Sequence, residues 1–316
     1  MVRSIANLPG SFSLKNIKSK PYWYYQTPDL TGRQTQILIG RATAKLTALI
    51  DIHRSGAGAK SHLKQLAQQA MAVGCPYMGT THAKIIARLA DTGFFQAGGI
   101  LVGTHVFMGY RNHLGVGWVS GVPTVDLDFA RAGKNISVAI PSDVKMDMGA
   151  AIDSLKMGFV PVKSLTTYVK SDETDLQIDF VTSMHHGGDT TVLVKALNAT
   201  MQPHKFMEFS METPIQMTVL AQQGSITVTV PPPEKYVVHK LLVYGERPQS
   251  GTVKSMKDLE QAAALVDYLG RHDADALNGA WVDLLGRGDG WLQRAQEGLL
   301  ALKNRYPSID TRALAL

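Results

Sequence analysis

Two aspartates stand one residue apart in an apolar segment, and this arrangement restricts the fold more than any other feature of the chain. The segment is TVDLDFA, in which Asp126 and Asp128 flank Leu127, and Val125 and Phe129 are apolar neighbours. This composition predicts a buried strand. Because successive side chains of a strand point to opposite faces, both aspartates lie on the same face. Burying one carboxylate is costly, so two together need a partner that compensates their charge.

A divalent cation is the partner that best satisfies two converging carboxylates. Two like charges held close together raise each other's pKa unless a cation lies between them. Carboxylate oxygens are the ligands that Mg²⁺ prefers. Asp179, in the later apolar segment LQIDFVTS, supplies a third carboxylate if the two strands are neighbours. The three acids therefore predict a site for one or two Mg²⁺ ions, or Mn²⁺ in their place, of the kind used in phosphoryl and nucleotidyl transfer.

A glycine turn precedes this strand and predicts a phosphate site. The segment GGILVGT is a short buried strand that ends at Gly103 and Thr104, and HVFMGYRNHLG is the helix that follows. Gly103 allows the backbone to approach an anion closely. Thr104 offers a hydroxyl and an amide at the helix N-terminus, where the macrodipole favours phosphate. Each motif is common by itself, but their order along the chain favours a site for a metal-bound triphosphate.

In this order the motifs resemble the nucleotidyltransferase fold shared with DNA polymerase beta. Val102-Gly103-Thr104, Asp126-Leu127-Asp128 and Asp179 occupy the positions of that pattern. The segments GGILVGTHVF, VDLDFA, IDFVTS, PPPEKYVVHKLLV and KSMKDLEQAAAL are similar to those of a bacterial group of nucleotidyltransferase-fold proteins, from about Pro21 to the last helices. The chain departs from the pattern in two ways. Thr104 stands where Gly or Ser is usual, and the long gap before Asp126 implies an inserted loop.

The resemblance implies transfer of a nucleoside monophosphate from an NTP to an acceptor hydroxyl, with release of pyrophosphate. The acceptor is an RNA, such as a tRNA end, or a protein. The chain is also similar to nucleotidyltransferase toxins of the abortive-infection type, in which a lysine of the helix after the sheet meets the nucleotide phosphates. On this resemblance Lys240 neutralises the leaving pyrophosphate, and Asp258 orients Lys240 or Arg247. The alternatives are a lysine whose stem packs along apolar surface and an ion pair on a helix surface.

Three other functions remain open on the same residues. A small molecule of the antibiotic type could serve as the acceptor, since the fold does not decide among acceptors. A non-catalytic module that binds nucleotide or RNA is a second reading, against which the presence of all three acids argues. A metal-dependent hydrolase that uses the same carboxylates is the third.

The chain is expected to divide into three parts of the α/β (α+β) class. Residues 1–85 form a hairpin and a helical extension, residues 86–233 a polymerase-beta-like mixed sheet with helices, and residues 234–316 a helical C-terminal domain. PYWYYQTPDLTGRQTQILIG predicts a β-hairpin whose rings either pack on the next domain or, beside lysines, stack bases. The helix that follows is expected to break at Ser55–Gly58.

Composition narrows the function classes further. No apolar run is long enough for a membrane span, and no signal peptide is present, so a cytoplasmic protein is expected. A single cysteine, Cys75, suits a reducing compartment and reads as a packed residue or turn. The net charge of +6 forms no basic tail, which favours a cleft for a phosphate-bearing ligand and leaves nucleic acid open. His185 and His186, in a glycine loop, face solvent or line the cleft.

Overall fold

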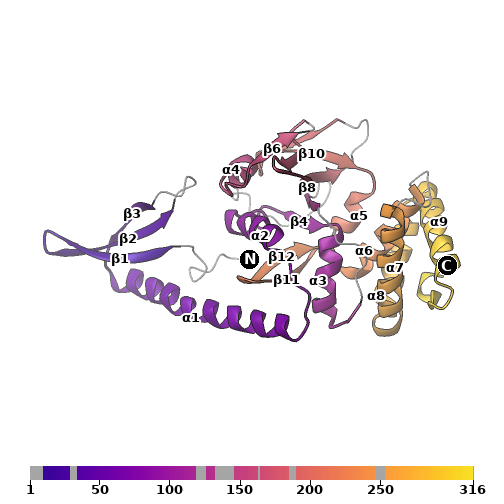
Figure 1. Cartoon of the computed structure of the whole chain (residues 1–316), viewed down its shortest axis with the longest axis horizontal. Coiled ribbons are helices and arrows are strands. Elements are labelled where there is room, and N and C mark those ends of the chain that lie inside the picture. The colour runs from indigo at the N-terminus through magenta and orange to yellow at the C-terminus, as the bar shows by residue number, and fades with distance from the viewer. Residues whose placement is uncertain are drawn as a thin grey trace.

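The computed structural model describes residues 10–28, 34–118, 126–131, 146–162, 164–184, 190–246 and 253–315. An N-terminal sheet and helix, a central mixed sheet and a C-terminal group of helices follow one another along the long axis of the molecule (Figure 1). The fold class expected from the sequence, a mixed α/β arrangement with a largely helical C-terminal region, is confirmed. Within the described residues, no helix is long and apolar enough to cross a membrane.

The first sheet and helix form an extension that we call the N-terminal arm (residues 10–28 and 34–72). Strands β1 (Ser11–Ile17), β2 (Lys20–Pro28) and β3 (Gln34–Arg41) form an antiparallel sheet with β2 in the middle, and α1 (Ala44–Ala72) follows. The predicted hairpin is β2–β3. One face of the sheet packs on α1. The Trp23 indole donates a hydrogen bond to Thr47 Oγ1 at 3.3 Å, and the Phe12 ring contacts the His53 ring.

Helix α1 is continuous, so the break expected at Ser55–Gly58 is wrong. The segment holds no proline, and a glycine weakens a helix by only about 1 kcal/mol relative to alanine. With 29 residues, α1 is about 43 Å long. Its far part contacts the strands β11 and β12, so the helix connects the N-terminal sheet to the body of the molecule (Figure 1).

The central sheet has seven strands in mixed orientation. Five run in the order β4-β5-β8-β10-β9, while β7 pairs with β8 and β6 with β7. The pairs β5–β8 and β8–β10 are parallel and the others antiparallel. The elements of this region are α2 (Thr80–Thr92), β4 (Gly99–Val102), α3 (Thr104–Leu114), β5 (Leu127–Arg131), α4 (Met148–Asp153), β6 (Phe159–Val162), β7 (Thr167–Lys170), β8 (Glu173–Ser183), β9 (Val192–Val194), β10 (Ala199–His204) and α5 (Met207–Met211).

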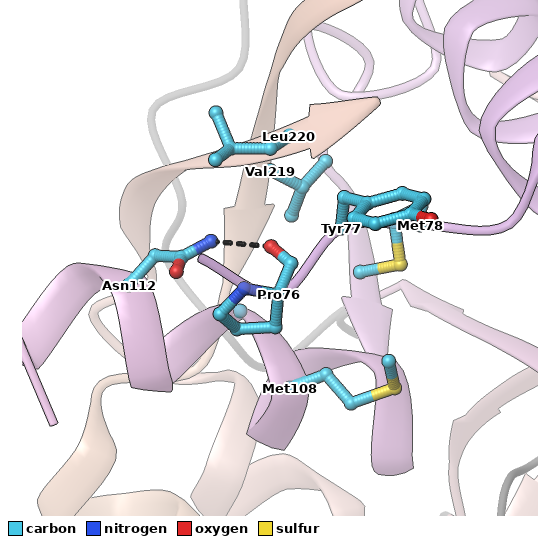
Figure 2. Close-up of a pocket in the computed structure, with 8 residues that line it drawn as sticks. Pro76, Tyr77, Met78, Met108, Asn112, Val219 and Leu220 are labelled. Atoms are coloured by element: carbon cyan, nitrogen blue, oxygen red, sulfur yellow. Dashed lines mark hydrogen bonds between the residues drawn. The ribbon is translucent and has the colours of Figure 1, made fainter. Parts of the chain in front are cut away.

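A separate hairpin joins the arm to the central sheet. Strands β11 (Ile215–Ala221) and β12 (Gly224–Val230) pair in antiparallel orientation around a turn at Gln222 and Gln223. The linker after α1 lies against this hairpin and α3: the Met78 amide donates to Leu220 O at 2.8 Å, and Asn112 Nδ2 donates to Pro76 O at 2.7 Å (Figure 2). The cavity between them measures about 10 Å³, which is room for one water at most.

Four helices and a short 3₁₀ helix form the C-terminal region: α6 (Pro233–Glu246), α7 (Val253–His272), α8 (Ala274–Leu285), α9 (Asp289–Arg305) and η2 (Arg312–Leu314). Glycine lets α6 and α9 approach each other closely. A Cβ atom at Gly245 would lie 2.1 Å from Arg294 O, and one at Gly298 would lie 2.1 Å from Leu241 O. Helix α6 is thereby held in place from behind, while its other side faces the cavity described next. The domain boundaries given above stay a prediction.

Candidate active site

The three predicted acids line one cavity. Asp128 and Asp179 are partners on the neighbouring parallel strands β5 and β8. Asp126 precedes β5, which begins at Leu127, so the expectation that it lies within the strand is wrong, and its side chain is exposed. All three line a cavity of about 1240 Å³. This volume is at or above the upper end of the range for small-molecule sites.

The glycine turn closes tightly over Asp128. Gly103 has φ 74° and ψ −160°, and α3 begins with Thr104 directly after it. A Cβ atom at Gly103 would lie 2.2 Å from Asp128 Oδ2, so no other residue fits here without displacing that carboxyl. The positive φ independently favours glycine. The predicted phosphate turn and the predicted metal ligands are therefore in contact.

Burial sets the ionisation of Asp128. Its surroundings raise the pKa of this carboxyl to about 6, chiefly through desolvation and further through the charges of Asp179 and Asp126; Lys254 and Lys240 oppose the rise. Among the described residues, no hydrogen bond or ion pair reaches the Asp128 side chain. A half-buried carboxylate without a direct partner is an unfavourable arrangement that a bound cation relieves.

Asp179 is oriented by a neighbouring strand. Thr167 of β7 donates its hydroxyl proton to Asp179 Oδ1 at 2.6 Å, and Thr167 itself is buried. Strands β7 and β8 are paired so that these two residues lie opposite each other. The second carboxylate oxygen, Oδ2, is left for another ligand. No local pattern indicates a role for Thr167, because its contact with Asp179 depends on the pairing of β7 with β8.

Lys240 and Asp258 meet at the C-terminal side of the cavity. Lys240 Nζ lies 2.6 Å from Asp258 Oδ1, and the two side chains are 15% and 6% exposed. Lys240 also lies over the Tyr236 ring, 5.2 Å from its centroid. Both residues line the same cavity as the three acids. A pair this far from solvent differs from a helix-surface ion pair, which is the alternative that the sequence left open.

Two further lysines of α7 line the cavity and were missed by the sequence reasoning. Lys254 and Lys257 are three residues apart, which places them on one face of the helix. Burial lowers the pKa of Lys257, and the charge of Lys240 lowers it further. The segment KSMKD contains the spacing that would have identified both residues, had the orientation of α7 been known.

A buried hydroxyl links the glycine turn to the C-terminal helices. The Tyr236 hydroxyl lies 3.1 Å from Gly103 O and 2.8 Å from Gln261 Oε1. Gln261 Nε2 in turn donates to Thr104 Oγ1 at 3.4 Å. Burial, followed by the charges of Asp258 and Asp128, raises the pKa of Tyr236 well above its usual value, so the hydroxyl stays protonated. The turn and α6–α7 are thus connected by a polar network.

Arg247, His185 and His186 lie outside the described residues. His105 is buried at the start of α3, with its Nε2 3.0 Å from His82 Nδ1. Burial lowers the pKa of His105 to about 3, so its ring is neutral. It packs against His82 at the start of the helix.

Comparison with known proteins decides the family. A family model described as "Nucleotidyltransferase" matches residues 80–286, well over half of the chain. The chain belongs to this nucleotidyltransferase family. The matched region runs from α2 through α8 and includes every acid and lysine of the cavity. No curated protein matches the sequence.

A solved structure also shows a distant likeness. The crystal structure of an antigenic nucleotidyltransferase-like protein from Paracoccidioides brasiliensis is 12% identical, with a TM-score of 0.28, and the match covers 75% of this chain and 92% of that one. At this TM-score the likeness adds nothing to the assignment, which depends on the family match.

The cavity of this nucleotidyltransferase family member is lined by the type of side chain that binds a divalent cation. The donor set consists of oxygens from Asp126, Asp128 and Asp179, which is the chemistry that Mg²⁺ requires. Asp128 is half-buried and carries a raised pKa, as described above. Within the described residues, no three His, Cys, Asp or Glu side chains stand close enough to hold an ion as they are. Coordination therefore requires these carboxylates to turn toward one another.

Proposed function

We propose that this protein transfers a nucleoside monophosphate from an NTP to the hydroxyl of an RNA or protein acceptor and releases pyrophosphate. The observation that carries the proposal is the distribution of charge in the cavity. Carboxylates enter it from β5 and β8, and Lys240, Lys254 and Lys257 enter it from α6 and α7. A metal-bound triphosphate needs both kinds of group in one site. The order of the motifs supports a place in the DNA polymerase beta superfamily.

In this proposal the three acids act at the α-phosphate and the acceptor hydroxyl. Asp126, Asp128 and Asp179 would hold Mg²⁺, which would supply positive charge to the phosphates and lower the pKa of the acceptor hydroxyl. Asp179 accepts the hydroxyl proton through Oδ2, because its Oδ1 already accepts a hydrogen bond from Thr167. The acceptor oxygen forms a bond to the α-phosphorus. The bond from that phosphorus to the oxygen bridging to the β-phosphate breaks, and pyrophosphate leaves with the electron pair.

The remaining residues hold the leaving phosphates. The amide of Thr104 lies at the N-terminus of α3, where free amides and the macrodipole favour an anion. Lys240, Lys254 and Lys257 supply the positive charge that offsets the charge developing on pyrophosphate. Asp258 holds Lys240 in position through their 2.6 Å contact. These roles are specific enough to be separated by substitution.

The proposal is tested by following the label of an NTP. The full chain is incubated with Mg²⁺, total cell RNA and cell protein, and each α-³²P-labelled NTP in turn. Label should enter an RNA or protein band, and the same NTP labelled at the γ-phosphate should label only pyrophosphate. Asp128→Asn should lose the transfer by at least about 100-fold, with an unchanged circular dichroism spectrum. Asp153→Asn, which changes an exposed acid of α4, serves as the matched control and should keep full activity.

Each other outcome contradicts the proposal in its own way. If Asp128→Asn transferred label as well as the wild type, the carboxylate site would have no part in the reaction. Free nucleoside monophosphate without labelled acceptor would indicate a hydrolase. Metal-dependent nucleotide binding, with no product in any lane, would indicate a binding module.

A further inference from the structure

The positive charge of the chain is concentrated in its first 72 residues. These residues hold ten Lys and Arg and two Asp and Glu, a net charge of +8, whereas the other 244 residues of the chain carry a net charge of −2. The sequence-based expectation that charge is not concentrated is therefore incomplete: there is no short basic tail, but the whole N-terminal arm is basic. The whole of the family match, residues 80–286, lies beyond this arm.

The sheet of the arm has a face that does not pack on α1. Strand alternation places Trp23 and Tyr25 toward α1, and places Tyr22 and Tyr24 on the opposite face. Contacts agree with this assignment, because Trp23 is 4% exposed and hydrogen-bonded to α1. Tyr25 stacks near Phe12, which in turn contacts His53 of α1. We call the opposite side the outer face.

The outer face combines aromatic rings with cations. Lys15 lies opposite Tyr22 across β1–β2, and Lys15 Nζ is 5.2 Å from the centroid of the Tyr24 ring. The same ammonium group donates to Gln36 Oε1 at 2.6 Å. Arg41 lies opposite Tyr22 on the other side, across β2–β3. The tyrosines are half-buried and Lys15 and Arg41 are exposed, so both kinds of group are accessible to a ligand.

The charge on this sheet has a single sign. Lys18 and Lys20 stand at its β1–β2 turn and are exposed. The described residues of the sheet, 10–28 and 34–41, contain no Asp or Glu. Two copies of such a face would repel each other, which disfavours self-association through it. A polyanion complements the face instead.

We propose that the outer face of the N-terminal sheet binds single-stranded RNA and thereby holds the acceptor of the transfer reaction. Bases stack on Tyr22 and Tyr24, while Lys15, Lys20 and Arg41 contact phosphates. The second clause depends on the proposed function; the first does not. Helix α1 runs from this sheet to the hairpin β11–β12 beside the central sheet, so the length of the helix separates the outer face from the cavity (Figure 1). The acceptor is therefore a large or extended RNA that contacts the arm and the cavity together.

RNA binding is tested with the full chain, without NTP or metal. The anisotropy of a fluorescein-labelled 15-nucleotide RNA is measured against protein concentration at several salt concentrations. Lys15→Glu/Lys20→Glu should weaken binding at least tenfold. The slope of log K against log salt concentration should also become less steep by about 1.4, since each phosphate contact on a single strand contributes about 0.7 to that slope. Tyr24→Ala should weaken binding about tenfold through lost stacking, and Tyr24→Phe should retain it. Lys303→Glu/Arg305→Glu, on exposed positions of α9, is the charge-matched control and should bind like wild type.

The outcomes separate this inference from the proposed function. No RNA binding by the wild type, or equal binding by Lys15→Glu/Lys20→Glu, overturns the inference even if label transfer to a protein occurs. A wild-type dimer that this variant dissociates, without RNA affinity, overturns it in favour of a second copy. RNA binding that depends on the outer face, with no label transfer, supports the inference and overturns the proposed function alone.

Discussion

The backbone of Gly103 packs against the carboxyl group of Asp128, so that a Cβ atom on the glycine would lie 2.2 Å from Asp128 Oδ2. The start of α3 and the acid-bearing strand β5 therefore cannot move independently. Asp128 is in turn the partner of Asp179 across β5–β8. One chain of contacts thus joins the predicted phosphate turn to Asp128 and Asp179.

Gly103→Ala should disturb Asp128 and the turn together. The substitution combines a steric clash with a φ of 74° that L-residues rarely adopt, so we expect a loss of more than about 1 kcal/mol in the free energy of unfolding. Transfer should fall further than stability accounts for. The control is Gly279→Ala in α8, where a Cβ meets nothing within 4 Å. It should stabilise the protein by about 0.5–1 kcal/mol. Urea denaturation and the label assay measure both effects, and full activity of Gly103→Ala would contradict the arrangement.

Substitutions at Lys240 and Asp258 should change the stability of the protein and its activity in different ways. Lys240→Met removes the ammonium group that lies 2.6 Å from the Asp258 carboxyl, which is 6% exposed, and we expect a destabilisation of about 3 kcal/mol. Adding Asp258→Leu should recover most of that stability, because a well-packed apolar pair replaces a buried ion pair at little cost. Activity should remain low in both variants, since neither supplies the lysine charge to the leaving group. Recovery of activity along with stability in the double variant would leave Lys240 a structural role only.

Thr167→Val should weaken metal binding while keeping nearly the same side-chain shape at this position. The variant removes the hydroxyl that donates to Asp179 Oδ1. Residues that orient a metal ligand typically change metal affinity 10- to 100-fold, so we expect Mn²⁺ to bind about tenfold more weakly. Calorimetric titration of Mn²⁺ measures this directly. Thr218→Val, at an exposed position of β11, is the control. Unchanged Mn²⁺ affinity in Thr167→Val would show that Asp179 needs no orientation by this hydroxyl.

Glu212 should make stability depend on pH in the acid range. Although burial raises its pKa, hydrogen bonds from Arg287 and Lys235 outweigh that effect and the net pKa is lowered. A lowered folded-state pKa means that Glu212 contributes stability above its unfolded pKa, about 4.3. That contribution is lost as pH falls through the folded-state value.

The corresponding variant is Glu212→Gln. Calorimetric melting temperatures should be lower than those of the wild type at pH 7, and the difference should shrink toward zero as the pH falls below about 4. Glu297→Gln, at an exposed position of α9, should show little difference at either pH. A Glu212→Gln difference that stays constant with pH would mean that the hydrogen bonds, rather than the charge, hold these helices.

Local sequence patterns were sufficient for many elements. Gly93 ends α2 in the left-handed conformation, as its residue type favours. The hairpin β11–β12 turns at Gln222 and Gln223, directly before Gly224. Strands β1, β9 and β10 and the short helices α4 and α5 were not predicted, because each is short and is stabilised by its neighbours rather than by its own pattern. The continuity of α1 through its glycines was missed for the same reason: packing along a long helix outweighs a weak local preference.

By itself, the sequence determined the chemistry that this protein can offer. The spacing of Asp126 and Asp128, the Gly103–Thr104 turn and the acid in the second strand are local facts, and they predict a phosphate and metal site without any fold. Only the tertiary structure placed Asp179 beside Asp128, brought Thr167 to it, and turned Lys254 and Lys257 into the same cavity. The physical reason is that strand order and helix packing depend on contacts between distant segments. A pattern read along the chain records which side chains are available but not which of them meet.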